Sequence, residues 1–133
     1  MNNKSKKILS EISAGELFDK ISILEIKLEK IKDVESQKEI NKEYDVLKKA
    51  QNFNVEITKK LKYLFEEIKK INLNLWNIEN KIRTCEKNKS FGKVFIDLAR
   101  EVYFNNDKRS KIKSKINKIS GSNINEIKQY IDY

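Results

Sequence analysis

The chain has 133 residues, of which 37% are charged and 38% hydrophobic, and its formal net charge is +9. This length fits one domain with a modest core. Three glycines and no proline suit long uninterrupted helices better than strands. No apolar run approaches the roughly 18 residues that a membrane-spanning helix needs. We therefore expect a single all-α domain over residues 1–133, with no membrane insertion.

The excess of lysine does not by itself predict nucleic-acid binding. The lysines are interleaved with glutamate and aspartate, a pattern typical of solvated helix faces. The only arginines are Arg83, Arg100 and Arg109, and no recognisable DNA- or RNA-binding signature is present. The single cysteine cannot form an internal disulfide, which favours a cytoplasmic protein.

The first 30 residues predict an arm and a helix. Residues 1–12 form a loosely held arm, whose Ile8, Leu9 and Ile12 are candidates to dock on the body. Ser13-Ala14-Gly15-Glu16 is typical of a capping box, in which Ser13 accepts from a free backbone N–H and Glu16 reaches back. The helix that follows ends near residues 32–33. Its apolar seam is formed by Leu17, Ile21, Leu24, Leu28 and Ile31.

The middle of the chain predicts a short helix and a very long one. The short helix covers residues 35–50, and the asparagines at 52–54 favour a turn. The long helix covers residues 55–86 and ends in a turn at 87–90. Its seam alternates steps of four and three: Ile57, Leu61, Leu64, Ile68, Ile71, Leu75, Ile78, Ile82 and Cys85.

The last long helix is expected to begin after Ser90, its N-cap, and to end at the glycine of 120–122. Its seam contains two polar residues in succession, Asn105 and Arg109, which should require an acidic partner on a facing helix. The alternative is a break at 105–107, with Asp107 capping a further helix; we favour the continuous helix. Residues 123–133 are expected to form a short C-terminal docking helix.

Short connections predict antiparallel packing. The two longest helices should form the core hairpin, the first helix should lie in its groove, and the second should cover an edge. The predicted fold is an all-α, antiparallel helical bundle with long, coiled-coil-like helices.

Few residues of the chain are candidates for catalysis or for binding a metal or phosphate. The chain has no histidine and no glycine-rich phosphate loop, and Cys85 lies on the long seam as a small buried hydrophobe. Acidic pairs such as Glu16 and Asp19 resemble the magnesium sites of all-α nucleotide pyrophosphohydrolases. However, Arg83 lies between Glu79 and Glu86 and would repel a metal. We expect no catalytic residue, no metal and no cofactor.

A polar stripe runs beside the long seam and carries Asn72, Trp76, Glu79, Arg83 and Glu86. In an antiparallel hairpin it should face polar residues of the last helix. One interpretation is an ion-pair network that fixes the register of the helices. The other is a pocket for an anionic small molecule, with arginines as forked donors and tryptophan as a stacking wall. The candidate ligand-binding residues are Trp76, Glu79, Arg83, Arg100, Tyr103, Asp107 and Arg109.

Two dense blocks of sequence carry a resemblance. The first is Ser13-Ala14-Gly15-Glu16-Leu17, followed by 19–21 and 23–27. The second is Leu75-Trp76-Asn77-Ile78-Glu79, followed by 82–83 and 85–86, and it continues through 91–113. The chain resembles an uncharacterised family of small all-helical bacterial proteins, a domain of unknown function. Asn80 departs from that family's acidic residue, and the tail at 125–130 matches it only in part.

The resemblance carries over no catalytic residue, so the expected function comes from the residues alone. Long amphipathic helices and a polar seam pair predict a module that acts by protein–protein contacts, with a protein partner or as a homodimer. The alternative is a binding protein or enzyme for an anionic small molecule, such as a nucleotide or nucleotide-sugar. Nucleic-acid binding driven by lysine is the third and least favoured interpretation.

Overall fold

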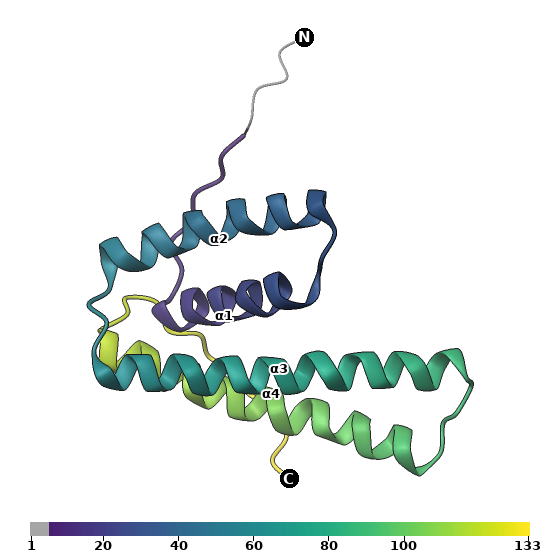
Figure 1. The fold of residues 1–133 in the computed structure, drawn as a ribbon. Helices are drawn as coiled ribbons and strands as arrows, with labels where there is room; N and C mark the ends of the chain where they lie inside the picture. The colour runs from purple at the N-terminus through teal and green to yellow at the C-terminus, as the bar shows by residue number, and fades with distance from the viewer. Residues whose placement is uncertain (1–5) are drawn as a thin grey trace.

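The computed structural model describes residues 6–133, so the first five residues of the predicted arm lie outside the described residues. Within them the fold is all-α, as predicted, and consists of four helices (Figure 1). The helices are α1 (Ala14–Lys30), α2 (Val34–Asn54), α3 (Lys59–Lys87) and α4 (Lys93–Ser120).

The two long helices organise the molecule. α4 runs back along α3, and α1 packs against both of them (Figure 1). Within residues 6–133, α2 packs only against α1, so α1 lies between α2 and the α3–α4 hairpin. Tyr44 on α2 donates a hydrogen bond of 3.1 Å to Glu25 on α1, and Lys69 on α3 pairs with the same carboxylate at 3.0 Å.

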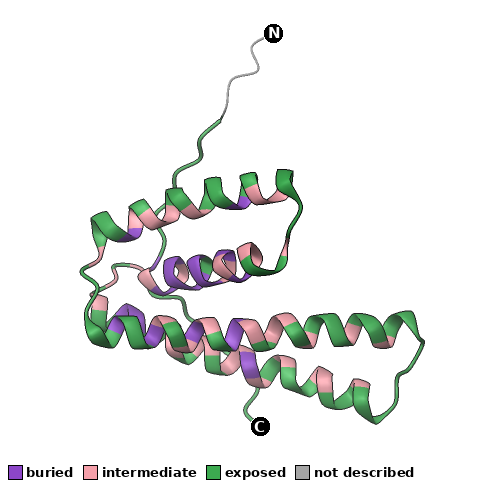
Figure 2. Ribbon diagram, viewed as in Figure 1, coloured by how far each residue is buried: buried purple, intermediate pink, exposed green. Residues whose placement is uncertain are grey.

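The core occupies only one end of the hairpin. Phe18 of α1 packs there with Leu61 and Leu64 of α3 and Ile116 of α4. Burying each such side chain stabilises the fold by about 1.5–3 kcal/mol. On α3 the buried residues end at Asn72, and on α4 none precedes Asn105 (Figure 2). The long apolar seam is therefore covered along only part of its length.

The start of α1 confirms half of the predicted capping box. Ser13 Oγ accepts a hydrogen bond of 3.0 Å from the backbone N–H of Glu16. The Glu16 carboxylate does not reach back to Ser13; it pairs with Lys113 on α4 at 2.5 Å. The arm preceding α1 does not dock as expected, since Ile8 and Leu9 are 85% and 91% exposed.

The connection between α2 and α3 lies later than predicted. α2 continues through the asparagines at 52–54, because the Asn54 amide donates to the Ala50 carbonyl at 2.8 Å within the helix. Thr58, whose hydroxyl accepts from the N–H of Leu61, then caps α3. The next turn falls where predicted, but Gly92, not Ser90, is the N-cap of α4.

α4 is continuous through residues 105–107, as favoured from the sequence, and the alternative break does not occur. The Asn105 amide donates to the Glu101 carbonyl one turn earlier at 2.8 Å, which satisfies it inside its own helix. Gly121 ends the helix in the left-handed conformation, with φ 69°, a role that glycine fills without strain.

The predicted C-terminal helix is wrong, because residues 123–133 are not helical. Ile127 and Ile131 stay exposed, so no apolar face stabilises a helix there. The tail instead brings Glu126 to Ser13 and Tyr133 to Asp107 on α4.

Candidate functional site

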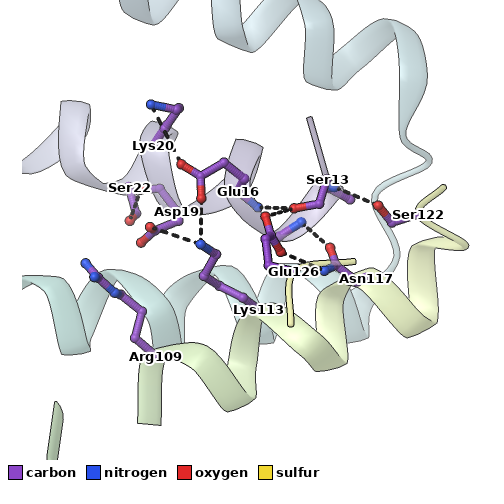
Figure 3. Close-up of polar contacts among 12 residues, drawn as sticks. Ser13, Glu16, Asp19, Lys20, Ser22, Arg109, Lys113, Asn117, Ser122 and Glu126 are labelled. Atoms are coloured by element: carbon purple, nitrogen blue, oxygen red, sulfur yellow. Dashed lines mark hydrogen bonds and ion pairs between the residues drawn. The ribbon is translucent and has the colours of Figure 1, made fainter. Parts of the chain in front are cut away.

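Buried polar side chains join α1, α3 and α4 where the core ends. The Asn72 amide on α3 donates hydrogen bonds to Asp19 Oδ1 at 2.7 Å and to Ser22 Oγ at 2.8 Å. Arg109 Nη1 on α4 donates to Asn72 Oδ1 at 3.2 Å. Figure 3 shows Arg109 rising from α4 toward Asp19 and Ser22 of α1. Asn72 is therefore the centre of the cluster, as both donor and acceptor.

Burial makes these contacts energetically important. Asp19 and Asn72 are each 5% exposed, and Ser22 is fully buried. Such groups are costly to desolvate unless their hydrogen-bonding atoms are satisfied. Asp19 and Ser22 lie one turn apart on α1, and the Ser22 hydroxyl also donates to the Asp19 carbonyl at 2.7 Å. One face of α1 thus presents both acceptors to α3.

Lys113 extends the polar contacts along α4. Its Nζ lies 2.5 Å from Glu16 Oε2 and 3.9 Å from Asp19 Oδ2 (Figure 3). The acidic pair that resembled half of a magnesium site therefore faces a lysine. This lysine offsets part of the negative charge of the two carboxylates and holds the start of α1 against α4.

The C-terminal tail, residues 123–133, contacts the same polar region at the start of α1. Glu126 accepts hydrogen bonds from Ser13 Oγ at 2.6 Å and from the Asn117 amide at 3.4 Å (Figure 3). Burial opposes ionisation of Glu126, but these hydrogen bonds, its own backbone N–H and the Lys113 charge outweigh burial and lower its pKa. The α1 backbone is also held here, because Gly15 N–H donates to Asn117 Oδ1 at 2.6 Å.

A cavity of about 320 Å³ opens beside Asn72. Three helices contribute to its walls, and its position coincides with the end of the covered core. The lining residues are Ile23 and Ile26 of α1, Asn72, Leu75, Trp76 and Glu79 of α3, and Val102, Asn106 and Arg109 of α4.

The structure brings together three of the seven predicted site residues. Trp76, Glu79 and Arg109 all line the cavity. Arg83, one turn beyond, pairs with Glu79 through Nη2 at 2.9 Å, but both side chains are exposed. An exposed ion pair of this kind contributes about 0.2–1 kcal/mol to the stability of the fold. The pair is therefore not the buried ion-pair network that was one interpretation of the polar stripe.

The other three predicted residues lie elsewhere on α4. Arg100 was expected within reach of Trp76 or Glu79, but its guanidinium lies over the Phe104 ring, 5.6 Å from the centroid. Tyr103 packs edge-on against Tyr133 of the tail. Asp107 accepts a hydrogen bond from the Tyr133 hydroxyl, which raises the pKa of Tyr133 to about 12.

The partner predicted for the polar seam pair is wrong. Asn105 is satisfied by Glu101 of its own helix. Arg109 bonds to an amide oxygen, and among the described residues no carboxylate lies within ion-pair distance of it. A half-buried arginine at the wall of a cavity therefore lacks an anionic partner inside the described part of the chain.

Several residues of the site escaped prediction. The sequence pattern indicates Asp19 only as a candidate metal ligand, and it does not mark Ser22 or Asn106 as site residues. Asn72 did carry a signal, because it stands on the polar stripe directly beside the buried seam. Asn106 follows Asn105, and two adjacent amides on a helix give no indication of which one faces a cavity.

A second surface lies at the hairpin end, which we define as residues 73–104. None of its residues is fully buried (Figure 2). A groove of about 450 Å³ lies there between α3 and α4, lined by Asn80, Lys81, Thr84, Cys85, Val94 and Leu98. Cys85 is half-buried in this groove and not fully buried as predicted.

These features define an all-α protein of four helices with a polar cluster, a cavity and an uncovered hairpin end. In residues 6–133 no helix combines the length and apolar character needed to cross a membrane. Residues 8–132 match the family described as "Family of unknown function (DUF6165)". The chain belongs to that family, which confirms the resemblance to an uncharacterised helical domain. No curated protein and no solved structure matches the chain.

Proposed function

We propose that this chain is a protein-interaction module whose contact surface is the hairpin end, and that the surface pairs with a second copy of the chain. The observation that carries the proposal is the uncovered seam. On both helices the apolar positions continue past the last buried residues, Asn72 and Asn105, and none of the described residues at 73–104 is fully buried.

Exposed apolar side chains mark this surface. Val94 and Ile96 are 68% and 53% exposed, and Phe91 beside them is half exposed. An amphipathic helix is stabilised mainly by burial of its apolar face, so a long uncovered seam favours a partner.

The small net charge of the hairpin end allows a second copy to be that partner. Residues 73–104 contain six basic and four acidic residues, so the net charge of this region is only +2 (6 − 4), in proportion to the chain as a whole. Two copies can therefore approach here without strong repulsion. Two hairpins related by a twofold axis present the same residues to each other and together make a four-helix bundle.

Light scattering of the parent and of Val94→Glu tests this pairing. The parent should have twice the chain mass of 15.8 kDa at high concentration, and the variant the single mass. Val46→Glu on α2 is the matched control, because Val46 is similarly exposed and the change adds the same charge. Circular dichroism should show unchanged helix content in both variants.

The thiol of Cys85 gives an independent readout. It lines the groove with Val94, so pairing should slow its reaction with a disulfide reagent in the parent relative to Val94→Glu. A parent that stays monomeric at its highest soluble concentration would overturn the proposal, and so would equal effects of the Val94 and Val46 changes.

A further inference from the structure

We propose that the cavity beside Asn72 binds a small molecule that carries an oxyanion, a carboxylate or a phosphate, on a compact apolar or planar body. The site is distinct from the groove at the hairpin end, since the two share no lining residue. The cavity borders the hairpin end, to which its lining residues Leu75, Trp76, Glu79 and Val102 belong, but the binding proposed here does not need pairing, and each proposal is tested by its own variant.

Arg109 is the anion-binding residue. Its Nη1 is fixed by Asn72, and its Nε and Nη2 have no hydrogen-bond partner among the described residues. Among the described residues, every side-chain nitrogen or oxygen that lacks a hydrogen-bond partner is at least partly accessible to solvent. The Nε and Nη2 atoms of the half-buried Arg109 are therefore accessible to a ligand. A guanidinium offers a planar set of donors that matches carboxylate and phosphate oxygens.

The position of Arg109 is held before any ligand arrives. Asn72 is itself held by Asp19 and Ser22, both nearly or fully buried. A donor fixed in this way loses little side-chain entropy on binding, which favours affinity. The Asn106 amide also lines the cavity without a side-chain partner among the described residues and can contribute a second donor.

The remaining walls suit an apolar body. Trp76 offers a flat ring, and the aliphatic side chains of Ile23, Ile26 and Val102 complete the lining. A few fixed polar groups on mostly apolar walls are typical of small-molecule sites, and about 320 Å³ lies at the small end of their range. The ligand should therefore be compact, about the size of one ring with its acidic group.

Glu79 is the one acidic residue of the lining, and it must be reconciled with an anionic ligand. Its carboxylate pairs with Arg83 at 2.9 Å on the exposed side of α3, which offsets its charge. The net charge of +9 also favours the approach of anions. Glu79→Gln should consequently keep or strengthen binding.

Trp76 supplies a site-specific readout, because it is the only tryptophan of the chain and lines the cavity. Its emission is followed while the full chain is titrated with phenyl phosphate, with phenylacetate, and with neutral benzyl alcohol. At least one of the two acids should give a saturable change and bind about tenfold or more tightly than the alcohol. Which acid saturates identifies phosphate or carboxylate as the preferred group.

The decisive comparison is Arg109→Met against Arg100→Met. Both remove one positive charge, but Arg100 lies on Phe104 and not in the cavity. Arg109→Met should weaken binding about tenfold or more, and Arg100→Met less than about twofold. Arg109→Lys keeps the charge but loses the forked geometry, so it should bind weakly even if the methionine variant folds poorly.

Three results would overturn the proposal. One is the absence of a saturable change with both acids. Another is equal binding of the neutral alcohol, which would mean that the anion is not recognised. The last is an equal loss of affinity for the Arg109 and Arg100 variants, which would show that only overall charge matters. Repeating the titration with Val94→Glu separates these results from any effect of pairing.

Discussion

Gly15→Ala should destabilise the fold strongly, although the same change usually stabilises a helix. Gly15 lies in the first turn of α1, where the helix start crosses α4. A Cβ added there would lie 2.6 Å from the Lys113 carbonyl oxygen and 2.9 Å from Asn117 Oδ1. Because the nearest contact is backbone, no side-chain rotation relieves it, and α1 must move away from α4.

The magnitude follows from opposing terms. Forcing an extra methyl group into a packed contact costs about 1–3 kcal/mol, and weakening the Gly15 N–H bond to Asn117 adds about 0.5–1.5 kcal/mol. The higher helix propensity of alanine offsets at most about 1 kcal/mol of this loss in stability, and less at a position in the first turn. The net loss should be about 2–3 kcal/mol, which for a chain of 133 residues lowers the melting temperature by about 7–10 °C.

Thermal unfolding followed by circular dichroism measures this effect. Gly92→Ala is the matched control, because a Cβ there would meet nothing within 4 Å. Gly92 is an N-cap without a side-chain bond, so its replacement should cost less than about 1 kcal/mol. If Gly15→Ala melts at or above the temperature of the parent, the close approach of α1 and α4 is not tight and the reasoning fails.

Two further predictions concern the polar cluster and its tail contact. Asn72→Ala should lower the free energy of unfolding by about 3 kcal/mol or more, because it leaves Asp19 buried without its nearest hydrogen-bond partner. A denaturant titration measures this loss. Asn74 is exposed on the same helix, so Asn74→Ala should leave the free energy of unfolding nearly unchanged in the same titration. Glu126 has a folded-state pKa below its ordinary value of 4.5, so its contribution to stability is present above that pH and is lost as the pH falls below it. Glu126→Gln should therefore flatten the fall in melting temperature between about pH 6 and about pH 3, and an unchanged slope would contradict the assigned contacts.

The sequence predicts the helices well because their signals are local. Apolar steps of four and three identify α1, α3 and α4, and Ser13 and the glycine of 120–122 mark ends that the structure confirms. The asparagines at 52–54 mislead, since short polar side chains can satisfy either a turn or a helix end. The tail misleads for another reason: its isoleucines are helically spaced, but Ile127 and Ile131 remain exposed.

The candidate site could be predicted only in part. Spacing along one helix shows which residues share a face, and so it placed Trp76 and Glu79 together. It does not show which face of α4 turns toward α3, so Arg100 was predicted beside the tryptophan and instead lies on Phe104. The sequence does not show that Gly15 is needed where α1 meets α4. The close approach of these two backbones depends on how the helices pack and cannot be predicted from either segment alone.

The isolation of α2 has a consequence for how the molecule opens. Among residues 6–133 this helix rests on α1 alone, and its buried residues are only Ile40 and Gln51. It can therefore detach without disturbing the core between α1, α3 and α4. Partial unfolding that releases such a weakly held unit requires less free energy than global unfolding. The backbone amides of α2 should therefore exchange with solvent while those around Phe18 and Ile116 remain protected. In these terms the molecule is a stable body of α1, α3 and α4 to which α2 is attached as a separable helix.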